Sequence, residues 1–309
     1  MFSKIQWVID IFIKKNKEIV NQFVFLYLIL TYMSNINFMI CGCVRNCENY
    51  LENVFKNIKK IQNELNVIKI VLAYDESNDK TLYKLCQLKK NKDFDIEIII
   101  NKDKLTQHRT LNISNARNKL LEYIYDYEIN IDYFIMMDFD DVCSKPININ
   151  VLKESLKIKN KWDCVTFNNK NYYDFWALSL DNYIFSCWHW NKPREIIKYM
   201  YKCFKEKMNN AEMYIECDSA FNGFGIYKTK SFKHCLYNPV INPQLLDLEK
   251  IVQVSKKTNI KPFFIKNKLD CEHRNFHLLS KKINNSKIII FKKYLFPPYE
   301  GEHSSFLRE

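Results

Sequence analysis

The chain has 309 residues, a length that fits one large domain with a full hydrophobic core. Its composition, 47% hydrophobic and 27% charged, is that of an ordinary soluble protein and excludes a chain that is disordered throughout. The net charge of +12 favours anionic partners such as nucleotide phosphates or acidic lipids, but the lysines are scattered, which disfavours a nucleic-acid partner.

The eleven cysteines are odd in number and irregularly spaced. The one tight group, residues 41–47, has no second cluster with which to complete a zinc site. Cys164, Cys187 and Cys217 stand singly inside apolar runs. We therefore expect reduced, buried thiols, which are typical of a cytoplasmic protein.

The first 35 residues hold an apolar stretch, residues 20–33, that is interrupted by Asn21 and Gln22. It is short for a membrane span, which needs about 20 residues. We expect residues 1–35 to form a helical segment that packs on the domain or makes a peripheral contact with a membrane surface. The alternative is an N-terminal anchor with the rest of the chain in the lumen of the secretory pathway.

From residue 36 onward, apolar runs alternate with helical patterns. The periodicity predicts strands over residues 36–44, 67–75, 94–100 and 132–140, and helices over residues 46–65, 78–90 and 112–128. Asn112 or Ser114 is the expected cap of the third helix. This alternation predicts an α/β fold with a Rossmann-like, mostly parallel central sheet flanked by helices. After Pro146 the segments are aromatic-rich and less periodic, without a clear linker, so we expect a single domain made of two halves.

Three carboxylates follow the fourth predicted strand directly: Asp138, Asp140 and Asp141. Burying an unpaired carboxylate costs several kcal/mol, so these groups need either a cation or an open strand end. The Asp-x-Asp pair suits a hard divalent cation, Mg²⁺ or Mn²⁺, that is shared with substrate phosphates. A loop with aspartate caps is the simpler alternative. Ligands bind at the carboxyl ends of parallel strands, and therefore this end is the candidate site.

Other polar side chains gather at neighbouring points of the predicted sheet. Asp75 and Glu76 lie in the turn after the second strand. Arg109, Arg117 and Asn118 lie near the start of the third helix, where arginines suit phosphate. These residues predict a nucleotide site beside the Asp-x-Asp pair.

Three motifs occur in the order DESNDKT (residues 75–81), ARN (residues 116–118) and DFD (residues 138–140). In order and spacing they resemble the motifs of nucleotide-sugar glycosyltransferases of the GT-A fold. The resemblance implies that residues 36–146 bind the donor, a UDP- or GDP-linked sugar. It also implies that Asp75 or Glu76 contacts the base or ribose, and that Asp138 and Asp140 hold Mn²⁺ or Mg²⁺ and the diphosphate.

The second half, residues 147–309, is similar to galactosyltransferase-like enzymes and is expected to bind the acceptor. The segment AFNGFGIYKTKSF, residues 220–232, resembles a glycine-rich segment that precedes an acidic motif at the acceptor site, here DCEH, residues 270–273. It departs from the pattern because Asn222 replaces a glycine and a Glu-His pair replaces two acids. If the enzyme inverts the sugar configuration, Glu272 is the expected catalytic base, with Asp270 as second choice. If it retains the configuration, no base is needed and Glu272 would only orient the acceptor. The resemblance further implies a late histidine as third metal ligand, His303, with His273 and His277 as rivals.

Aromatic side chains and a carboxylate in the second half suit a sugar acceptor, because sugars stack their apolar faces on rings and their hydroxyls bind carboxylates. The expected acceptor residues are Asp174, Trp176, Trp188, Trp190 and His273. Simple core packing is the alternative for each tryptophan.

The resemblance therefore predicts an enzyme of glycan biosynthesis, a metal-dependent glycosyltransferase of hexosyltransferase type. It would move a sugar from a nucleotide diphosphate sugar to a hydroxyl of a glycan or protein-linked acceptor. One alternative is a catalytically inactive nucleotide-sugar-binding protein of the same fold. Another is a nucleotidyltransferase, which the single glycine in CGCVRNCEN, residues 41–49, disfavours.

Overall fold

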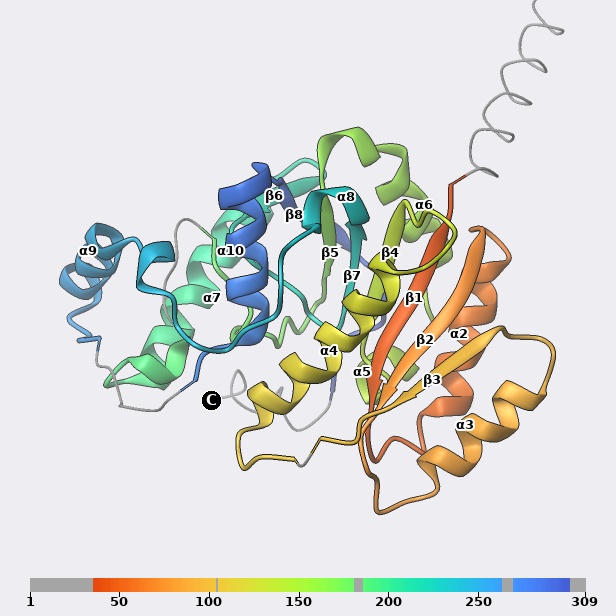
Figure 1. Ribbon diagram of the computed structural model, residues 1–309. Helices are drawn as coiled ribbons and strands as arrows, with labels where there is room; N and C mark the ends of the chain where they lie inside the picture. The colour runs from red at the N-terminus through yellow and green to blue at the C-terminus, as the bar shows by residue number, and fades with distance from the viewer. Residues whose placement is uncertain (1–35, 104, 181–185, 263–268, 301–309) are drawn as a thin grey trace, which may run out of the picture.

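The computed structural model describes residues 36–103, 105–180, 186–262 and 269–300 (Figure 1). These residues build an eight-stranded sheet in the order β3-β2-β1-β4-β7-β5-β8-β6. Its strands are β1 (Phe38–Val44), β2 (Val67–Tyr74), β3 (Ile96–Ile100), β4 (Tyr133–Met137), β5 (Cys164–Asn168), β6 (Tyr214–Cys217), β7 (Phe224–Lys228) and β8 (Ile288–Tyr294). The α-helices are α2 (Leu51–Gln62), α3 (Thr81–Lys90), α4 (Arg109–Tyr125), α5 (Asp141–Ser144), α6 (Ile149–Lys157), α7 (Pro193–Asn210), α8 (Thr229–Phe232), α9 (Leu248–Thr258) and α10 (Glu272–Asn284).

The strands β1 to β4 pair in parallel, and β5 is parallel to β8. Strand β7 runs antiparallel between β4 and β5, and β6 runs antiparallel beside β8. The remaining six strands therefore share one direction. The predicted fold class, a single α/β domain with a mostly parallel sheet flanked by helices, is confirmed.

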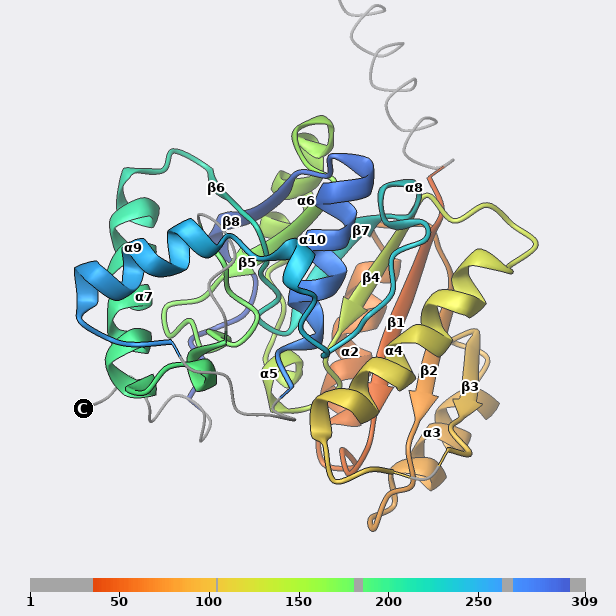
Figure 2. The same cartoon turned by 60° about the vertical axis from the view of Figure 1, so that its left-hand side comes forward.

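Successive side chains of a strand face opposite sides of the sheet, and each side has its own helical layer. On β1, Met39 and Cys41 belong to the core that includes side chains of α4, α7 and α10. Phe38 and Ile40 belong to the core that includes side chains of α2 and α6. Figure 2 shows α4 and α10 in front of the sheet and α2 behind it.

The four strands and three helices predicted before Pro146 are present, with shifted boundaries. The first helix, predicted from residue 46, begins at Leu51, and the fourth strand, predicted to reach residue 140, ends at Met137. Helix α4 begins at Arg109, before either expected cap. The side-chain oxygen of Asn112 accepts the backbone N–H of Thr106 (2.9 Å), and the hydroxyl of Ser114 donates to the carbonyl of Thr110 (2.7 Å). Both side chains therefore serve the interior of the helix or the loop before it rather than its first turn.

All eleven cysteines lie in the described ranges as free thiols, and Cys164, Cys187 and Cys217 are buried as predicted. Across the described residues, no helix combines the length and the apolar character that a bilayer span requires. The expected helical segment at residues 1–35 and the predicted metal ligand His303 lie outside the described residues.

Candidate active site

The Asp-x-Asp turn lies where β4 ends against the start of β7. The backbone N–H of Asp138 donates to the carbonyl of Gly223 (2.9 Å). The ring of Phe139 turns into the core and is 2% exposed, whereas Asp138 and Asp140 stay partly exposed. Asp140 also caps α5, because its side chain accepts the backbone N–H of Val142 (3.1 Å). The turn thus presents two carboxylates at the carboxyl end of a buried parallel strand.

Gly42 of β1 makes room for this turn. A Cβ at this position would lie 2.2 Å from Cε2 of Phe139 and 2.9 Å from the carbonyl oxygen of Met137. A side chain here would push Phe139 out of its place, and the two aspartates that flank it would move with it. Sequence reasoning used Gly42 only as the single glycine of residues 41–49, because its contact with Phe139 joins positions almost a hundred residues apart.

Arg117 of α4 is a buried cation beside the Asp-x-Asp turn. Its guanidinium is 3.4 Å from Asp138 and forms an ion pair with Glu272, at the start of α10. The guanidinium also lies over the ring of Phe221, 4.9 Å from its centroid. Burial alone would lower the pKa of Arg117, but the carboxylates of Glu272 and Asp138 raise it above its ordinary value. Arg117 is therefore a fixed positive charge that joins the two halves of the chain.

The carboxylates of this site are crowded. Burial raises the pKa of Asp138 well above its ordinary value, and Asp140 raises it further. Burial likewise raises the pKa values of Asp140 and Asp174. Arg109, an exposed residue at the start of α4, is near enough to lower the pKa values of both Asp138 and Asp140 in part. A group of carboxylates whose negative charge is only partly offset by nearby arginines fits a hard divalent cation. Phosphates of a donor would fill the remaining coordination positions of that cation.

Two histidines predicted as rival metal ligands are core residues. His277 bonds the hydroxyls of Ser219 (2.9 Å) and Tyr227 (3.2 Å), and burial lowers its pKa to about 3. His273 is 2% exposed and stacks on Phe221, with ring centroids 3.9 Å apart. Because both ring nitrogens of His277 are bonded to hydroxyls, its prediction as a metal ligand is corrected, whereas the roles predicted for His273 stay predictions. Among the described residues, no group of three or more His, Cys, Asp or Glu side chains forms a complete metal site.

The predicted nucleotide residues lie at the neighbouring strand ends. Asp75, which directly follows β2, is 8% exposed and accepts the side-chain amide of Asn101 (2.7 Å). Glu76 is exposed, and its carbonyl accepts the side chain of Arg45 (3.2 Å). The structure thus brings Asp75 and Glu76 to the same edge of the sheet as the Asp-x-Asp turn.

Asn118 contacts the backbone of the segment after α8. Its side-chain amide donates to the carbonyl of Tyr237 (2.9 Å), and its oxygen accepts the backbone N–H of the same residue (2.8 Å). This paired contact fastens the segment after α8 to helix α4. Both ends of the amide are bonded to the backbone, so Asn118 supports the site, and its contact with the nucleotide stays a prediction.

Three of the predicted acceptor residues, Asp174, Trp176 and Trp188, are at least partly exposed, and Trp190 is buried. The carboxylate of Asp174 accepts the backbone N–H groups of Asn222 (3.2 Å) and Ala177 (3.2 Å), beside the Asp-x-Asp turn. The rings of Trp176 and Trp188 lie 6.4 Å apart, and Trp188 is 37% exposed. Trp190 is 0% exposed, so it is a core residue and its predicted stacking on a sugar is corrected.

The carboxylate predicted as the second choice for the base is buried. Asp270 is 3% exposed, accepts the backbone N–H of Cys271 (2.8 Å) and lies 3.7 Å from Nε of Arg274. Its partners are those of a structural side chain, so Glu272 is the carboxylate of the DCEH motif that reaches Arg117. Sequence reasoning missed Arg274, because a charged side chain is usually at the surface.

Solved structures match this chain at low similarity. Staphylococcus aureus TarS in complex with UDP-GlcNAc matches at 14% identity and a TM-score of 0.44, over 87% of this chain and 61% of the other. A mannosyltransferase from Pyrobaculum calidifontis, in complex with GDP-Man and Mn²⁺, matches at 9% identity and a TM-score of 0.40, over 74% and 55%. Glucosyl-3-phosphoglycerate synthase from Mycobacterium tuberculosis, in complex with Mn²⁺, UDP and phosphoglyceric acid, matches at 9% and 0.40, over 64% and 57%.

The chain thus spans about three fifths of the length of these three proteins. No family model matches the sequence, and no curated protein matches it.

Proposed function

We propose that this protein is a metal-dependent glycosyltransferase that moves a sugar from a nucleotide diphosphate sugar to an acceptor hydroxyl. The observation that carries the proposal is the arrangement around Arg117, a buried cation between Asp138 and Glu272 at the carboxyl ends of parallel strands. An inverting transfer uses carboxylates for the cation that binds the departing diphosphate, a fixed positive charge and a separate carboxylate for the acceptor hydroxyl. The order of the DESNDKT, ARN and DFD motifs along the chain supports the same function.

On the donor side, Asp138 and Asp140 would hold Mn²⁺ or Mg²⁺ together with the diphosphate. When bound, the cation supplies Lewis-acid stabilisation to the departing diphosphate. Arg117 adds a positive charge that does not have to reorganise during the reaction, because it is already held by two carboxylates. Asp75 and Glu76 are proposed to bind the base or ribose.

On the acceptor side, the sugar carbon passes through an oxocarbenium-like state, and a base takes the proton of the attacking hydroxyl. Glu272 is proposed as that base in an inverting reaction. Asp174 is proposed to bind acceptor hydroxyls, and the exposed edge of the Trp176–Trp188 pair to stack on the acceptor sugar.

The experiment is a product analysis with purified protein, Mn²⁺ and a panel of UDP- and GDP-sugars. A glycosyltransferase releases the nucleoside diphosphate, by transfer or by slow hydrolysis, and release should require Mn²⁺. The Asp138→Asn variant is the control and should be inactive. Release of a nucleoside monophosphate, or transfer of a nucleotidyl group, would instead indicate a nucleotidyltransferase. Nucleotide-sugar binding without turnover would indicate the inactive binding protein.

A further inference from the structure

Arg274 is a fully buried arginine in the first turns of α10, and its guanidinium binds one loop of the acceptor half. Its Nε donates to the carbonyl of Trp176 (2.6 Å), and its Nη2 donates to the carbonyls of Phe175 (3.2 Å) and Leu178 (2.8 Å). Its Nη1 donates to the hydroxyl of Ser179 (2.8 Å). One side chain thus gathers four acceptors from five consecutive residues of an irregular segment.

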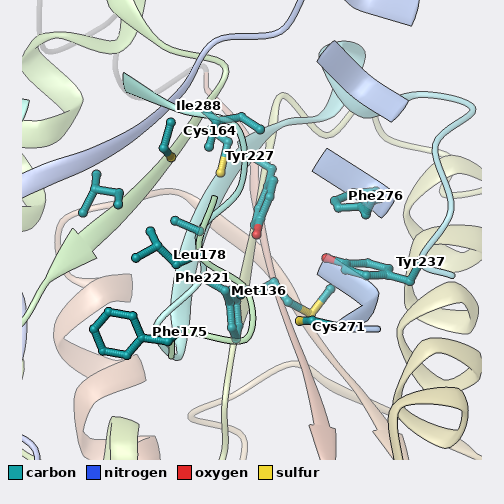
Figure 3. Close-up of a cluster of buried hydrophobic side chains, with 14 of the residues drawn as sticks. Met136, Cys164, Phe175, Leu178, Phe221, Tyr227, Tyr237, Cys271, Phe276 and Ile288 are labelled. Atoms are coloured by element: carbon teal, nitrogen blue, oxygen red, sulfur yellow. The ribbon is translucent and has the colours of Figure 1, made fainter. Parts of the chain in front are cut away.

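The loop held in this way, residues 174–179, carries the proposed acceptor contacts. It begins with Asp174 and includes Trp176, and its apolar side chains face the core. Figure 3 shows Phe175 and Leu178 in the same buried cluster as Phe221 and Met136. The far end of the loop is fixed by a bridge between Ser179 and Ser219.

Helix α10 holds this loop and the donor half at the same time. Residues 272 and 274 are two positions apart, and therefore about 200° apart around the helix axis. Glu272 points to Arg117, which in turn contacts Asp138. Arg274 points to the loop, and Asp270, 3.7 Å from its Nε, helps to balance its charge. The first turn of α10 thus connects the donor side to the acceptor side through two oppositely directed side chains.

We propose that Arg274 is a positioning residue for the acceptor: it sets the places of Asp174 and Trp176 relative to Glu272 and the donor. This inference rests on the proposed function. Arginine suits the task because its planar fork can reach several carbonyls at once. A lysine has one ammonium at the end of a flexible stem, so it could keep the charge beside Asp270 but not all four contacts with the loop.

The test compares Arg274→Lys with wild type in three measurements on the full chain. The first is binding of UDP and GDP in the presence of Mn²⁺, by calorimetry. The second is acceptor-free hydrolysis of the nucleotide sugar that wild type turns over. The third is the rate of transfer to methyl glycosides as acceptors, with KM and kcat determined separately. Arg194→Lys, at an exposed position of α7, is the matched control.

We expect Arg274→Lys to keep nucleotide binding and acceptor-free hydrolysis, and to lose about a hundredfold in kcat/KM for the acceptor, the effect of misplacing a reacting group by about 1 Å. Ser179→Ala removes one of the four contacts with less risk to folding. It should show the same selective loss at a smaller scale, about three- to tenfold. Arg194→Lys should change none of the three measurements.

An equal loss of hydrolysis and transfer in Ser179→Ala and Arg274→Lys would overturn the inference, because it is the result expected of a merely structural residue. Unchanged transfer in both variants would overturn it as well. A wild-type chain that binds no nucleotide and releases no nucleoside diphosphate gives a different result, since it contradicts the proposed function itself.

Discussion

Arg117 and Glu272 are 155 positions apart in the sequence and form a buried ion pair between helices α4 and α10. The pair stands beside Asp138, so the cation of the donor half and the carboxylate of the acceptor half meet at one point. Breaking a buried ion pair by removing one partner is strongly destabilising, typically by about 3–5 kcal/mol. Substitutions that keep hydrogen bonding are therefore the better probes of this site.

We expect Asp138 and Asp140 to be required for nucleotide binding while lowering the stability of the metal-free protein. Asp138→Asn and Asp140→Asn should each abolish Mn²⁺-dependent nucleotide binding. Because the folded-state pKa values of both groups are raised, ionisation disfavours the folded state at neutral pH, and stability falls as pH rises through those values. Each variant should therefore melt at a higher temperature than metal-free wild type at pH 7.

Asp141→Asn is the matched control for this prediction, because Asp141 is the adjacent carboxylate and lies in the first turn of α5. It should leave nucleotide binding in place. Wild-type affinity for UDP and GDP with Mn²⁺ in either Asp138→Asn or Asp140→Asn would contradict the assigned role of the pair.

Glu272→Gln keeps the shape of the proposed base and removes its ability to accept a proton. In an inverting enzyme, turnover should fall by about two to four orders of magnitude, the usual effect of losing a general base. Binding of UDP or GDP with Mn²⁺ should persist, since the amide can still accept from Arg117. Steady-state kinetics check this, with Glu249→Gln at an exposed position of α9 as control. A loss below about tenfold would count against Glu272 as the base.

Gly42→Ala should disturb the turn from the neighbouring strand β1. The added Cβ meets the ring of Phe139 and the carbonyl of Met137, and overpacking of this kind costs about 1–3 kcal/mol. Nucleotide binding with Mn²⁺ should weaken as well, because Asp138 and Asp140 flank the displaced ring. The double variant Gly42→Ala/Phe139→Leu should recover part of both losses in a double-mutant cycle. Simple additivity of the two single variants would show that the ring does not transmit the effect.

The variant His277→Gln tests whether His277 has a structural role or binds a metal ion. Loss of its bonds to Ser219 and Tyr227 should cost about 1–3 kcal/mol of the free energy of unfolding. Affinity for Mn²⁺ and nucleotide should stay unchanged. A clear fall in metal affinity in a folded variant would restore His277 as a ligand.

The same histidine predicts a pH dependence. Its folded-state pKa of about 3 lies below its ordinary value of 6.5. In that window the unfolded state binds one more proton, so this group makes stability fall as pH drops from 6.5 toward 3, by about 1.4 kcal/mol per pH unit. The difference in the free energy of unfolding between wild type and His277→Gln should therefore shrink in acid, as measured by urea titrations at several pH values. A constant difference would contradict burial of the neutral ring.

Local patterns in the sequence were sufficient to predict the first half of the fold. Strands β1 to β4 are apolar runs and α2 to α4 have helical spacing, so their order and the position of Asp138 after β4 could be predicted. The insertion of β7 between β4 and β5 could not, because it depends on pairing Tyr133 with Lys228 across 95 positions. The ion pair of Arg117 with Glu272 could not be predicted for the same reason, because its partners are far apart in the sequence.

In the second half of the site, residue type alone did not predict which side chains are exposed. Trp176, Trp188 and Trp190 look alike in sequence, yet Trp190 alone is fully buried among the three. Which ring faces solvent depends on how the segment before α7 packs, and no short-range pattern encodes that packing. Arg274 was missed for a related reason, since a charged side chain in a helix is usually at the surface.

The most direct test of the central claim is calorimetric titration of the wild-type chain with UDP- and GDP-sugars, with and without Mn²⁺. The account predicts that at least one nucleotide sugar binds only when Mn²⁺ is present, and that Asp138→Asn removes the heat of binding. At a hundred times its dissociation constant, that ligand should add about 2.7 kcal/mol to the free energy of unfolding. Absence of binding for every nucleotide sugar with Mn²⁺ or Mg²⁺, or equal binding by Asp138→Asn, would contradict the account.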